Sequence, residues 1–256
     1  MTVELSYDLV AATSPTTQTV VFIGSLGSTR SMWDAQVEAL SDHLDVIAVD
    51  LRGHGTSPVS IGPYTVAELA DDVLALLDSL GREHVHLVGL SLGGAIAQWI
   101  SVHRPERVAS LTLLCTSARF GDPQGWIDRA ATVRDHGTRS IADAVLERWF
   151  TVDFGESVDA YRNMIASTSD EGYAACCEAL AGWDNRADLG NISSPTLVIA
   201  GKEDPATTPA DMAVIADGIP RAEFHVLSPA AHLANVEQYE QVSRLLKDHI
   251  GRAENA

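Results

Sequence analysis

The sequence predicts an α/β fold with a mostly parallel central sheet and helices on both of its faces. Three observations predict it. Six short runs are rich in β-branched and apolar residues, helix-period stretches lie between them, and the 256 residues suffice for a large buried core. Runs that are apolar throughout are typical of strands covered on both faces. Because such runs alternate with helical stretches, we expect the strands to pair mainly in parallel.

The elements can be assigned in chain order. The predicted strands are TVVFI at 19–23, DVIAVD at 45–50, VHLVGL at 85–90, SLTLLC at 110–115, PTLVIAG at 195–201 and EFHVLS at 223–228. A helix is predicted over 65–80, because Thr65 with Glu68 three residues later forms a capping-box pattern and Gly81 follows its end. A second helix, over 235–250, has a similar apolar stripe and closes the fold.

One region between two predicted strands contains no convincing strand of its own. Residues 118–188, called the inserted segment below, contain helical patterns such as PQGWIDRAATVRDHG and SIADAVLERWF. We expect an α/β core of residues 1–117 and 189–256, with the inserted segment forming a helical cap over the site. A separate helical domain is the alternative. It is disfavoured because the segment is short and strands of one sheet flank it on both sides.

Composition excludes several classes of partner. With 17 basic and 35 acidic residues the formal charge is −18, which opposes binding to nucleic acid or to an anionic membrane, although solubility alone also explains such a charge. No apolar run reaches about 18 residues and the start MTVELSYDLV is unlike a signal peptide, so we expect a cytoplasmic protein. Cys115, Cys176 and Cys177 lack metal-ligand spacing and are expected to be small buried apolar residues.

The stretch from Gly89 to Gly93 reads GLSLG and matches G-x-S-x-G, in which Ser91 occupies a strained turn between a strand and a helix. Both glycines are needed because a Cβ there would collide with neighbouring backbone. The motif follows the strand VHLVGL and leads into AIAQWISVH, whose helical N-terminus favours negative charge beside the serine. A glycine-rich structural turn is the alternative interpretation.

A nucleophilic serine needs a base, and the base needs an orienting acid. His232 lies in PAAHLANVEQ, after the last predicted strand and before the final helix, where a base can reach the serine. In the expected order of serine, acid and histidine, Asp204 follows the strand TLVIAG, with Glu203 as its main rival and Asp211 as a weaker one. The end of the preceding strand, LLCTSARF, contains no carboxylate, which favours Asp204.

Hydrolysis also requires donors for the oxyanion. We expect one from the backbone N–H of Leu92 and the other from the loop GSLGS, residues 24–28, with Leu26 as the best position. The glycine-broken turn DLRGHGTS, residues 50–57, is interpreted as structural, with His54 as a weak site candidate.

Together these motifs resemble the α/β-hydrolase superfamily over nearly the whole chain. Within it, GSLGSTRSMW, LCTSARFGDPQGWIDRA, VLERWFT and PAAHLANVEQ resemble the 3-oxoadipate enol-lactonases. Most hydrolases of this fold have His-Gly where this chain has Gly24-Ser25, and the enol-lactonases share that departure. The resemblance implies a Ser-Asp-His hydrolase that forms an acyl-enzyme, opens a small anionic enol-lactone in aromatic catabolism (the β-ketoadipate pathway), and uses no cofactor or metal.

The inserted segment is the expected source of substrate specificity. It holds seven arginines and no lysine, and guanidinium suits a carboxylate ligand. Trp126, Arg129 and Val133 fall on one helix face by their spacing, so Trp126 and Arg129, with Ser25, are the substrate-binding candidates. A solvated arginine and a core tryptophan are the alternative. Arg30, Trp33 and Gln98 are weaker candidates.

Three readings stay open at this point. A general carboxylesterase or a cofactor-free haloperoxidase of the same fold would use the same three catalytic residues. A non-catalytic ligand-binding protein would have no need of all three. The oligomeric state, including a homo-oligomer, is left open by the sequence.

Overall fold

The centre of the protein is a mostly parallel sheet, as predicted. In the computed structural model, which describes residues 1–155 and 157–254, seven strands pair in the order β1-β3-β2-β4-β5-β6-β7. Their bounds are Tyr7–Val10 for β1, Thr19–Ile23 for β2, Asp45–Val49 for β3, Val85–Leu90 for β4, Val108–Leu114 for β5, Thr196–Gly201 for β6 and Glu223–Leu227 for β7. All pairs are parallel except β1 with β3.

Strand β1 is the element that sequence patterning missed. It lies at the edge of the sheet and pairs antiparallel with β3, with Tyr7 opposite Val49. All four of its residues are exposed, so the segment lacks the continuous apolar run by which the other strands were recognised.

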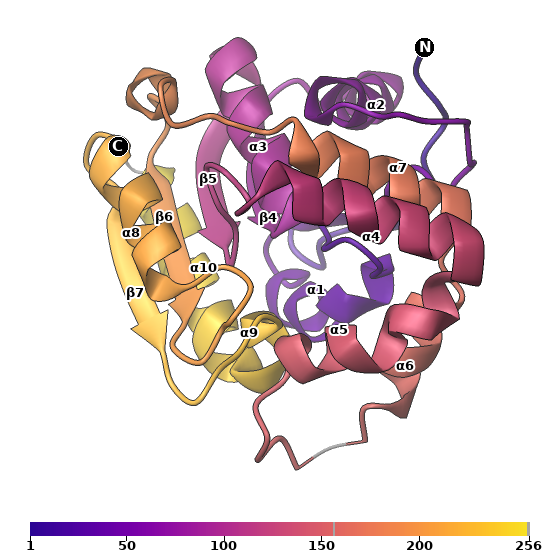
Figure 1. The fold of residues 1–256 in the computed structure, drawn as a ribbon. Coiled ribbons are helices and arrows are strands. Elements are labelled where there is room, and N and C mark those ends of the chain that lie inside the picture. The colour runs from indigo at the N-terminus through magenta and orange to yellow at the C-terminus, as the bar shows by residue number, and fades with distance from the viewer. Residues whose placement is uncertain (156, 255–256) are drawn as a thin grey trace.

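Helices cover both faces of the sheet (Figure 1). Those of the core are α1 Asp34–Leu40, α2 Val66–Ser79, α3 Leu92–His103, α8 Pro209–Gly218, α9 Ala234–Glu237 and α10 Tyr239–Ala253. Short 3₁₀ turns occur at Arg30–Trp33, Pro105–Arg107, Thr138–Ile141 and Leu189–Asn191. The predicted capping box is confirmed, because Thr65 and Glu68 exchange hydrogen bonds at the start of α2.

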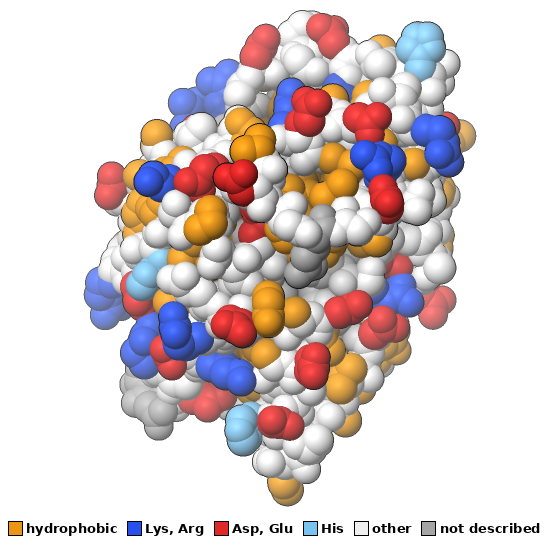
Figure 2. All heavy atoms as spheres, turned by 90° about the horizontal axis from the view of Figure 1, so that it is seen from below, with side chains coloured by type: hydrophobic (Ala, Val, Ile, Leu, Met, Phe, Trp, Pro, Cys, Tyr) orange, Lys and Arg blue, Asp and Glu red, His pale blue; other side chains and the backbone are white. Residues whose placement is uncertain are grey.

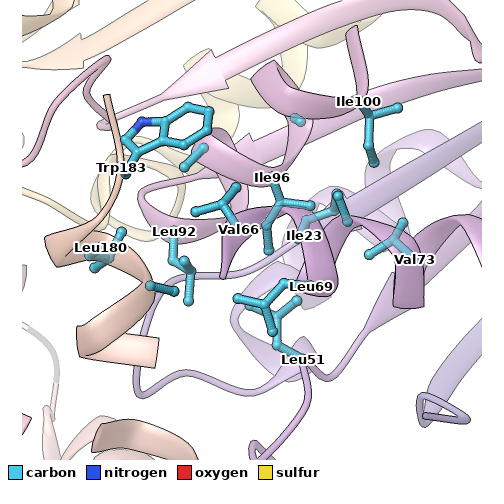
Figure 3. Close-up of a cluster of buried hydrophobic side chains, with 14 of the residues drawn as sticks. Ile23, Leu51, Val66, Leu69, Val73, Leu92, Ile96, Ile100, Leu180 and Trp183 are labelled. Atoms are coloured by element: carbon cyan, nitrogen blue, oxygen red, sulfur yellow. The ribbon is translucent and has the colours of Figure 1, made fainter. Parts of the chain in front are cut away.

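In the central strands, alternate residues enter two separate cores, because successive side chains point to opposite faces. In β2, Val21 and Ile23 join the cluster that includes α2 and α3, whereas Val20 and Phe22 join the cluster that includes α1 and α10. Figure 3 shows the first cluster. Its labelled members are Ile23, Leu51, Val66, Leu69, Val73, Leu92, Ile96, Ile100, Leu180 and Trp183.

The inserted segment forms four α-helices within its described residues, between β5 and β6. They are α4 Pro123–His136, α5 Ala142–Trp149, α6 Asp159–Ala166 and α7 Asp170–Ala181. Helices α4 and α7 run side by side (Figure 1). Where α7 begins, the backbone of Gly172 presses on the turn at Gly53, and a Cβ built on Gly172 would lie 2.5 Å from Cα of Gly53. This close backbone contact between two glycines holds the start of α7 against the core.

The prediction of one continuous helix over 235–250 was wrong. The structure has α9 and α10, separated at Gln238, whose φ of −122° and ψ of 41° leave the helical region. The Gln238 side chain donates to the carbonyl of Pro229, 2.6 Å away, in the loop that contains His232. The break between α9 and α10 therefore coincides with a tertiary contact to this loop. A periodic apolar pattern carries no information about such a contact.

The cysteine prediction is confirmed: Cys115, Cys176 and Cys177 are buried free thiols. Figure 2 shows one face of the molecule, on which acidic and basic side chains are interspersed. Among the described residues, every helix is too short or too polar to cross a membrane.

His86, in the middle of β4, makes folding stability depend on pH. Its Nδ1 meets Ser110 Oγ at 2.8 Å and its Nε2 meets Gln18 Oε1 at 3.0 Å. Burial, reinforced by His249 and His84, lowers its pKa from 6.5 to about 4. The unfolded chain therefore binds one more proton than the folded chain between these pH values, so stability is present above pH 6.5 and declines as pH falls towards 4.

We expect His86→Gln to flatten this decline. The loss assigned to His86 is about 3 kcal/mol, from a shift of about 2.5 units at 1.36 kcal/mol each. Urea unfolding of both proteins at pH 7 and pH 4.5 measures it, with the exposed His136→Gln as the matched control. An unchanged dependence on pH in His86→Gln would contradict the assignment.

Candidate active site

Segments that follow β2, β4, β5, β6 and β7 meet at one pocket of about 320 Å³. Ligand sites of open α/β sheets lie at these carboxyl ends. Leu26 follows β2, Ser91 follows β4, and His232 follows β7. The lining residues are Ser25, Leu26, Ser91, Phe120, Trp126, Arg129, Val145, Arg148, Trp149, Tyr173, Pro205, Ala206, Thr207 and His232.

Ser91 occupies a strained turn between β4 and α3. Its φ of 57° and ψ of −116° are unusual for a residue with a side chain. The flanking glycines allow the turn, because a Cβ on Gly89 would lie 2.3 Å from the carbonyl oxygen of Gly93, and one on Gly93 would lie 2.1 Å from that of Ile23. Thr116 Oγ1 donates to the Ser91 carbonyl at 2.7 Å. Strain held by its surroundings is typical of functional positions.

The structure brings Asp204 and His232 together. His232 Nδ1 lies 2.8 Å from Asp204 Oδ2, and both side chains are buried. Thr207 Oγ1 also donates to Oδ2 at 2.7 Å, while the N–H of Ala206 donates to Oδ1 at 2.7 Å. Burial alone would raise the pKa of Asp204, but His232 and these donors lower it below the ordinary value. A charged Asp204 favours the tautomer with a proton on Nδ1, which leaves Nε2 as an acceptor.

The two rival carboxylates have other partners. Glu203 accepts from Ser228 Oγ at 2.9 Å and from the N–H of Ala230 at 2.8 Å, which holds the loop that contains His232. Asp211 completes a capping box with Thr208 at the start of α8. Of the three carboxylates, Asp204 is the one that contacts His232.

The loop of His232 is attached to helix α5. The N–H of His232 donates to the Arg148 carbonyl at 3.3 Å, and that of Leu233 to the Trp149 carbonyl at 2.9 Å. Glu237, which sequence reasoning did not single out, adds a bridge. Its Oε2 accepts from the N–H of Ala231 at 2.6 Å, and its Oε1 accepts from Thr151 Oγ1 at 2.6 Å. The inserted segment thus contributes to the placement of His232.

The two expected oxyanion donors lie on different elements: Leu26 is among the residues that line the pocket, whereas Leu92 directly follows Ser91 and is fully buried outside the lining. Leu92 is the first residue of α3, where N–H groups have no intrahelical acceptor. The next N–H, that of Gly93, donates to the Gly24 carbonyl at 3.0 Å and so joins α3 to the loop of Leu26. The side chain of Leu26 lines the pocket.

His54 supports the loop of Leu26 rather than lining the pocket. Its Nε2 accepts from the N–H of Gly27 at 2.9 Å, and its Nδ1 meets the Arg52 carbonyl at 3.0 Å. This pattern requires a neutral ring with a proton on Nδ1. Burial lowers the pKa of His54, which favours that neutral form.

The weaker sequence candidates serve the fold. Arg30 pairs with Asp50 and Asp8 at the DLRGHGTS turn, and Trp33 stacks on Phe22 in the core. Gln98 Nε2 donates to the Ser117 carbonyl at 3.4 Å.

The structure places both substrate-binding candidates on α4 at the pocket. Trp126 and Arg129 line the pocket, and the Arg129 guanidinium lies over the Trp126 ring, 5.1 Å from its centroid. Trp126 Nε1 donates to the Phe120 carbonyl at 2.8 Å, which orients the ring. Val133, from the same predicted face, is fully buried in the core. Ser25 lines the pocket from the loop after β2.

Sequence reasoning missed Arg148, Trp149 and Tyr173, which line the pocket from α5 and α7. Arginine content marked the inserted segment as a whole, but a helical pattern does not reveal which helix faces a pocket. Within the described part of the chain, no cluster of three His, Cys, Asp or Glu side chains is arranged for a metal ion.

Comparisons with known proteins identify the proteins to which this chain is similar. Residues 18–239 match the α/β hydrolase fold family. The chain is 43% identical over 223 residues to 3-oxoadipate enol-lactonase 2 of Acinetobacter baylyi, an alignment that covers 86% of this chain and 83% of that protein.

Two solved structures have nearly the same fold. The enol-lactonase of Burkholderia xenovorans superposes with a TM-score of 0.93 at 37% identity, covering 96% of each chain. A thermophilic esterase of Thermogutta terrifontis, solved with malate bound, gives 0.92 at 32% identity, covering 98% of this chain and 94% of that one. The resemblance indicated by the motifs is thereby confirmed. The chain belongs to the α/β-hydrolase family, as an ester hydrolase related in sequence to the 3-oxoadipate enol-lactonases.

Proposed function

We propose that the protein opens the lactone ring of 3-oxoadipate enol-lactone and releases 3-oxoadipate. The observation with the greatest weight is that Ser91, His232 and Arg129 line one pocket. A nucleophile, a base and a cation can therefore act on a substrate that enters this pocket. Relatives at 43% and 37% identity are named for this activity. The catalytic set and the substrate are inferences from these two supports.

Acylation begins with Ser91 and His232. Ser91 Oγ attacks the lactone carbonyl carbon while its proton passes to Nε2 of His232. The bond from that carbon to the ring oxygen then breaks, the oxygen takes the proton from His232, and the resulting enol becomes a ketone. Asp204 holds the imidazole and stabilises its charged form. The product of this half-reaction is an ester of Ser91.

Deacylation reverses these roles with water. His232 takes a proton from the water molecule as its oxygen attacks the acyl carbon, and Ser91 leaves with that proton. The N–H groups of Leu26 and Leu92 hold the oxyanion in both halves. The proposed steps use side chains, backbone donors and water alone.

The charge of the substrate explains why the pocket contains guanidinium. The formal charge of the whole chain is −18, which opposes the approach of an anion. Arg129 supplies local positive charge, while Trp126 and Ser25 shape the pocket around the ring. The inserted segment serves as the cap, with residues 1–117 and 189–256 as the core. The three free thiols fit a reducing compartment such as the cytoplasm.

A kinetic comparison tests this function. Enol-lactone generated in place by a coupled enzyme and p-nitrophenyl acetate are assayed with the same preparation, and we expect a kcat/KM at least about 100-fold higher for the lactone, as differential transition-state binding permits. Values no better than those for simple esters would indicate a general esterase. Halogenation activity with hydrogen peroxide and no lactone hydrolysis would indicate a haloperoxidase.

A further inference from the structure

Two arginines of the inserted segment face the pocket without a carboxylate beside them. Arg129 comes from α4 and Arg148 from the last turn of α5, and both line the same cavity as Ser91. No Asp or Glu is among the described residues that line it. Arg148 is exposed to solvent on one side, and partial desolvation on the other, together with the nearby charge of Arg129, lowers its pKa. Two cations thus share one partly enclosed space, an arrangement that an anion between them would stabilise.

Three of the other five arginines of the inserted segment are paired with neighbouring carboxylates. Arg134 pairs with Glu171 and Glu178, Arg162 pairs with Asp143 and Asp159, and Arg186 pairs with Asp184. In a chain with 35 acidic residues against 17 basic ones, acidic partners are abundant. Arg119 and Arg139 also have no ion pair among the described contacts, but they lie outside the pocket lining. Arg129 and Arg148 are therefore the arginines of this segment that line the pocket without an acidic partner.

Tyr173 of α7 completes the group. It lies close enough to both guanidiniums for each to act on its hydroxyl, yet burial dominates and raises the pKa of Tyr173 well above its ordinary value. The hydroxyl therefore stays protonated and can donate a hydrogen bond. The ring lies against the loop of Leu26, since a Cβ built on Gly27 would come within 3.0 Å of its Cε2. Tyr173 thus connects the arginines to the oxyanion side of the pocket.

We propose that Arg129, Arg148 and Tyr173 form a carboxylate subsite, which selects esters and lactones that have a free carboxylate beyond the scissile bond. Three helices contribute one donor each, so a bound carboxylate also ties α4, α5 and α7 together. Planar guanidinium suits this ligand because it offers paired donors. The proposal rests on the proposed hydrolase chemistry at Ser91, but not on the identity of the enol-lactone.

Two esters that differ in charge provide the test. Monomethyl succinate has a free carboxylate, whereas dimethyl succinate is neutral and otherwise nearly the same. For Arg148→Met we expect kcat/KM on the charged ester to fall about 10- to 100-fold, as the loss of a hydrogen bond to a charged group implies, with a clearly smaller loss on the neutral ester. Tyr173→Phe should give a smaller loss in the same direction. Succinate should also inhibit Arg148→Met more weakly than the unchanged protein.

Arg139→Met is the matched control, because Arg139 is an exposed arginine of the same segment outside the pocket lining. It should leave the ratio of the two esters unchanged. Methionine at 148 keeps the backbone carbonyl that accepts from the N–H of His232. Equal losses on both esters would mean that Arg148 acts only through the His232 loop, and no loss on either would mean that it binds no carboxylate. Each result would overturn the subsite.

The proposed function and the subsite can fail separately. A protein that ignores the enol-lactone but loses charge selectivity in Arg148→Met would refute the proposed substrate and retain the subsite. A protein that hydrolyses the enol-lactone equally well with and without Arg148 would retain the function and refute the subsite. Activity on dimethyl succinate shows in each case that the variant is folded.

Discussion

Ser91→Ala is expected to lower kcat on the enol-lactone by about 10⁴-fold or more, because the attacking oxygen is removed while binding and the oxyanion donors remain. The fold should survive, because alanine only removes the hydroxyl of Ser91, whereas the flanking glycines that the turn requires are retained. Single-turnover kinetics measure the loss, and mass spectrometry of the unchanged protein with a slow ester should detect an adduct at Ser91. Appreciable lactonase activity in Ser91→Ala would contradict the mechanism.

The same position offers an independent readout of strain. Ser91 holds a φ of 57°, which glycine adopts at lower cost. We expect Ser91→Gly to be inactive and yet more stable than the original, by about 1 kcal/mol in urea unfolding. Ser79→Gly, at the end of α2 and outside the pocket lining, is the matched control, because glycine should destabilise an ordinary helical position. A destabilised Ser91→Gly would show that the turn is relaxed rather than strained.

Asp204→Asn is expected to lower kcat by about 10⁴-fold with little change in KM, because an amide does not hold the imidazole in the required tautomer or stabilise its charge. The contact at stake is the 2.8 Å pair between His232 Nδ1 and Asp204 Oδ2. Initial rates on the enol-lactone over a range of concentrations give kcat and KM for both proteins.

Glu203→Gln is the matched control for this second prediction, since it neutralises the adjacent carboxylate. Glu203 accepts from Ser228 and Ala230, so its loss should reduce stability by about 1 kcal/mol and change kcat less than about tenfold. If Glu203→Gln were the variant with the larger loss of kcat, the assignment of the acid would have to be exchanged.

Patterns along the chain determined the fold class and the elements that position the site. All six predicted strands lie in the sheet, and five of them match the observed strands to within one residue at both bounds. For the central strands the reason is that strands buried on both faces have continuous apolar runs. The turn at Ser91 could also be predicted from the sequence, because it requires glycine at both flanking positions. A Cβ at either position would lie only 2.1 or 2.3 Å from a backbone oxygen. Strand β1 was not predicted, because all of its residues are exposed and it lacks a continuous apolar run.

Only the tertiary structure distinguished residues whose sequence context is alike. Asp204 and Glu203 are adjacent in one loop, and their roles separate because one faces His232 and the other faces Ser228 and Ala230. Likewise, the sequence does not distinguish the seven arginines of the inserted segment from one another. In the structure, Arg129 and Arg148 line the pocket, whereas Arg134 pairs with acidic residues on α7. Local periodicity determines which side of a helix is buried. The packing of several helices against one another decides which buried side meets the nucleophile.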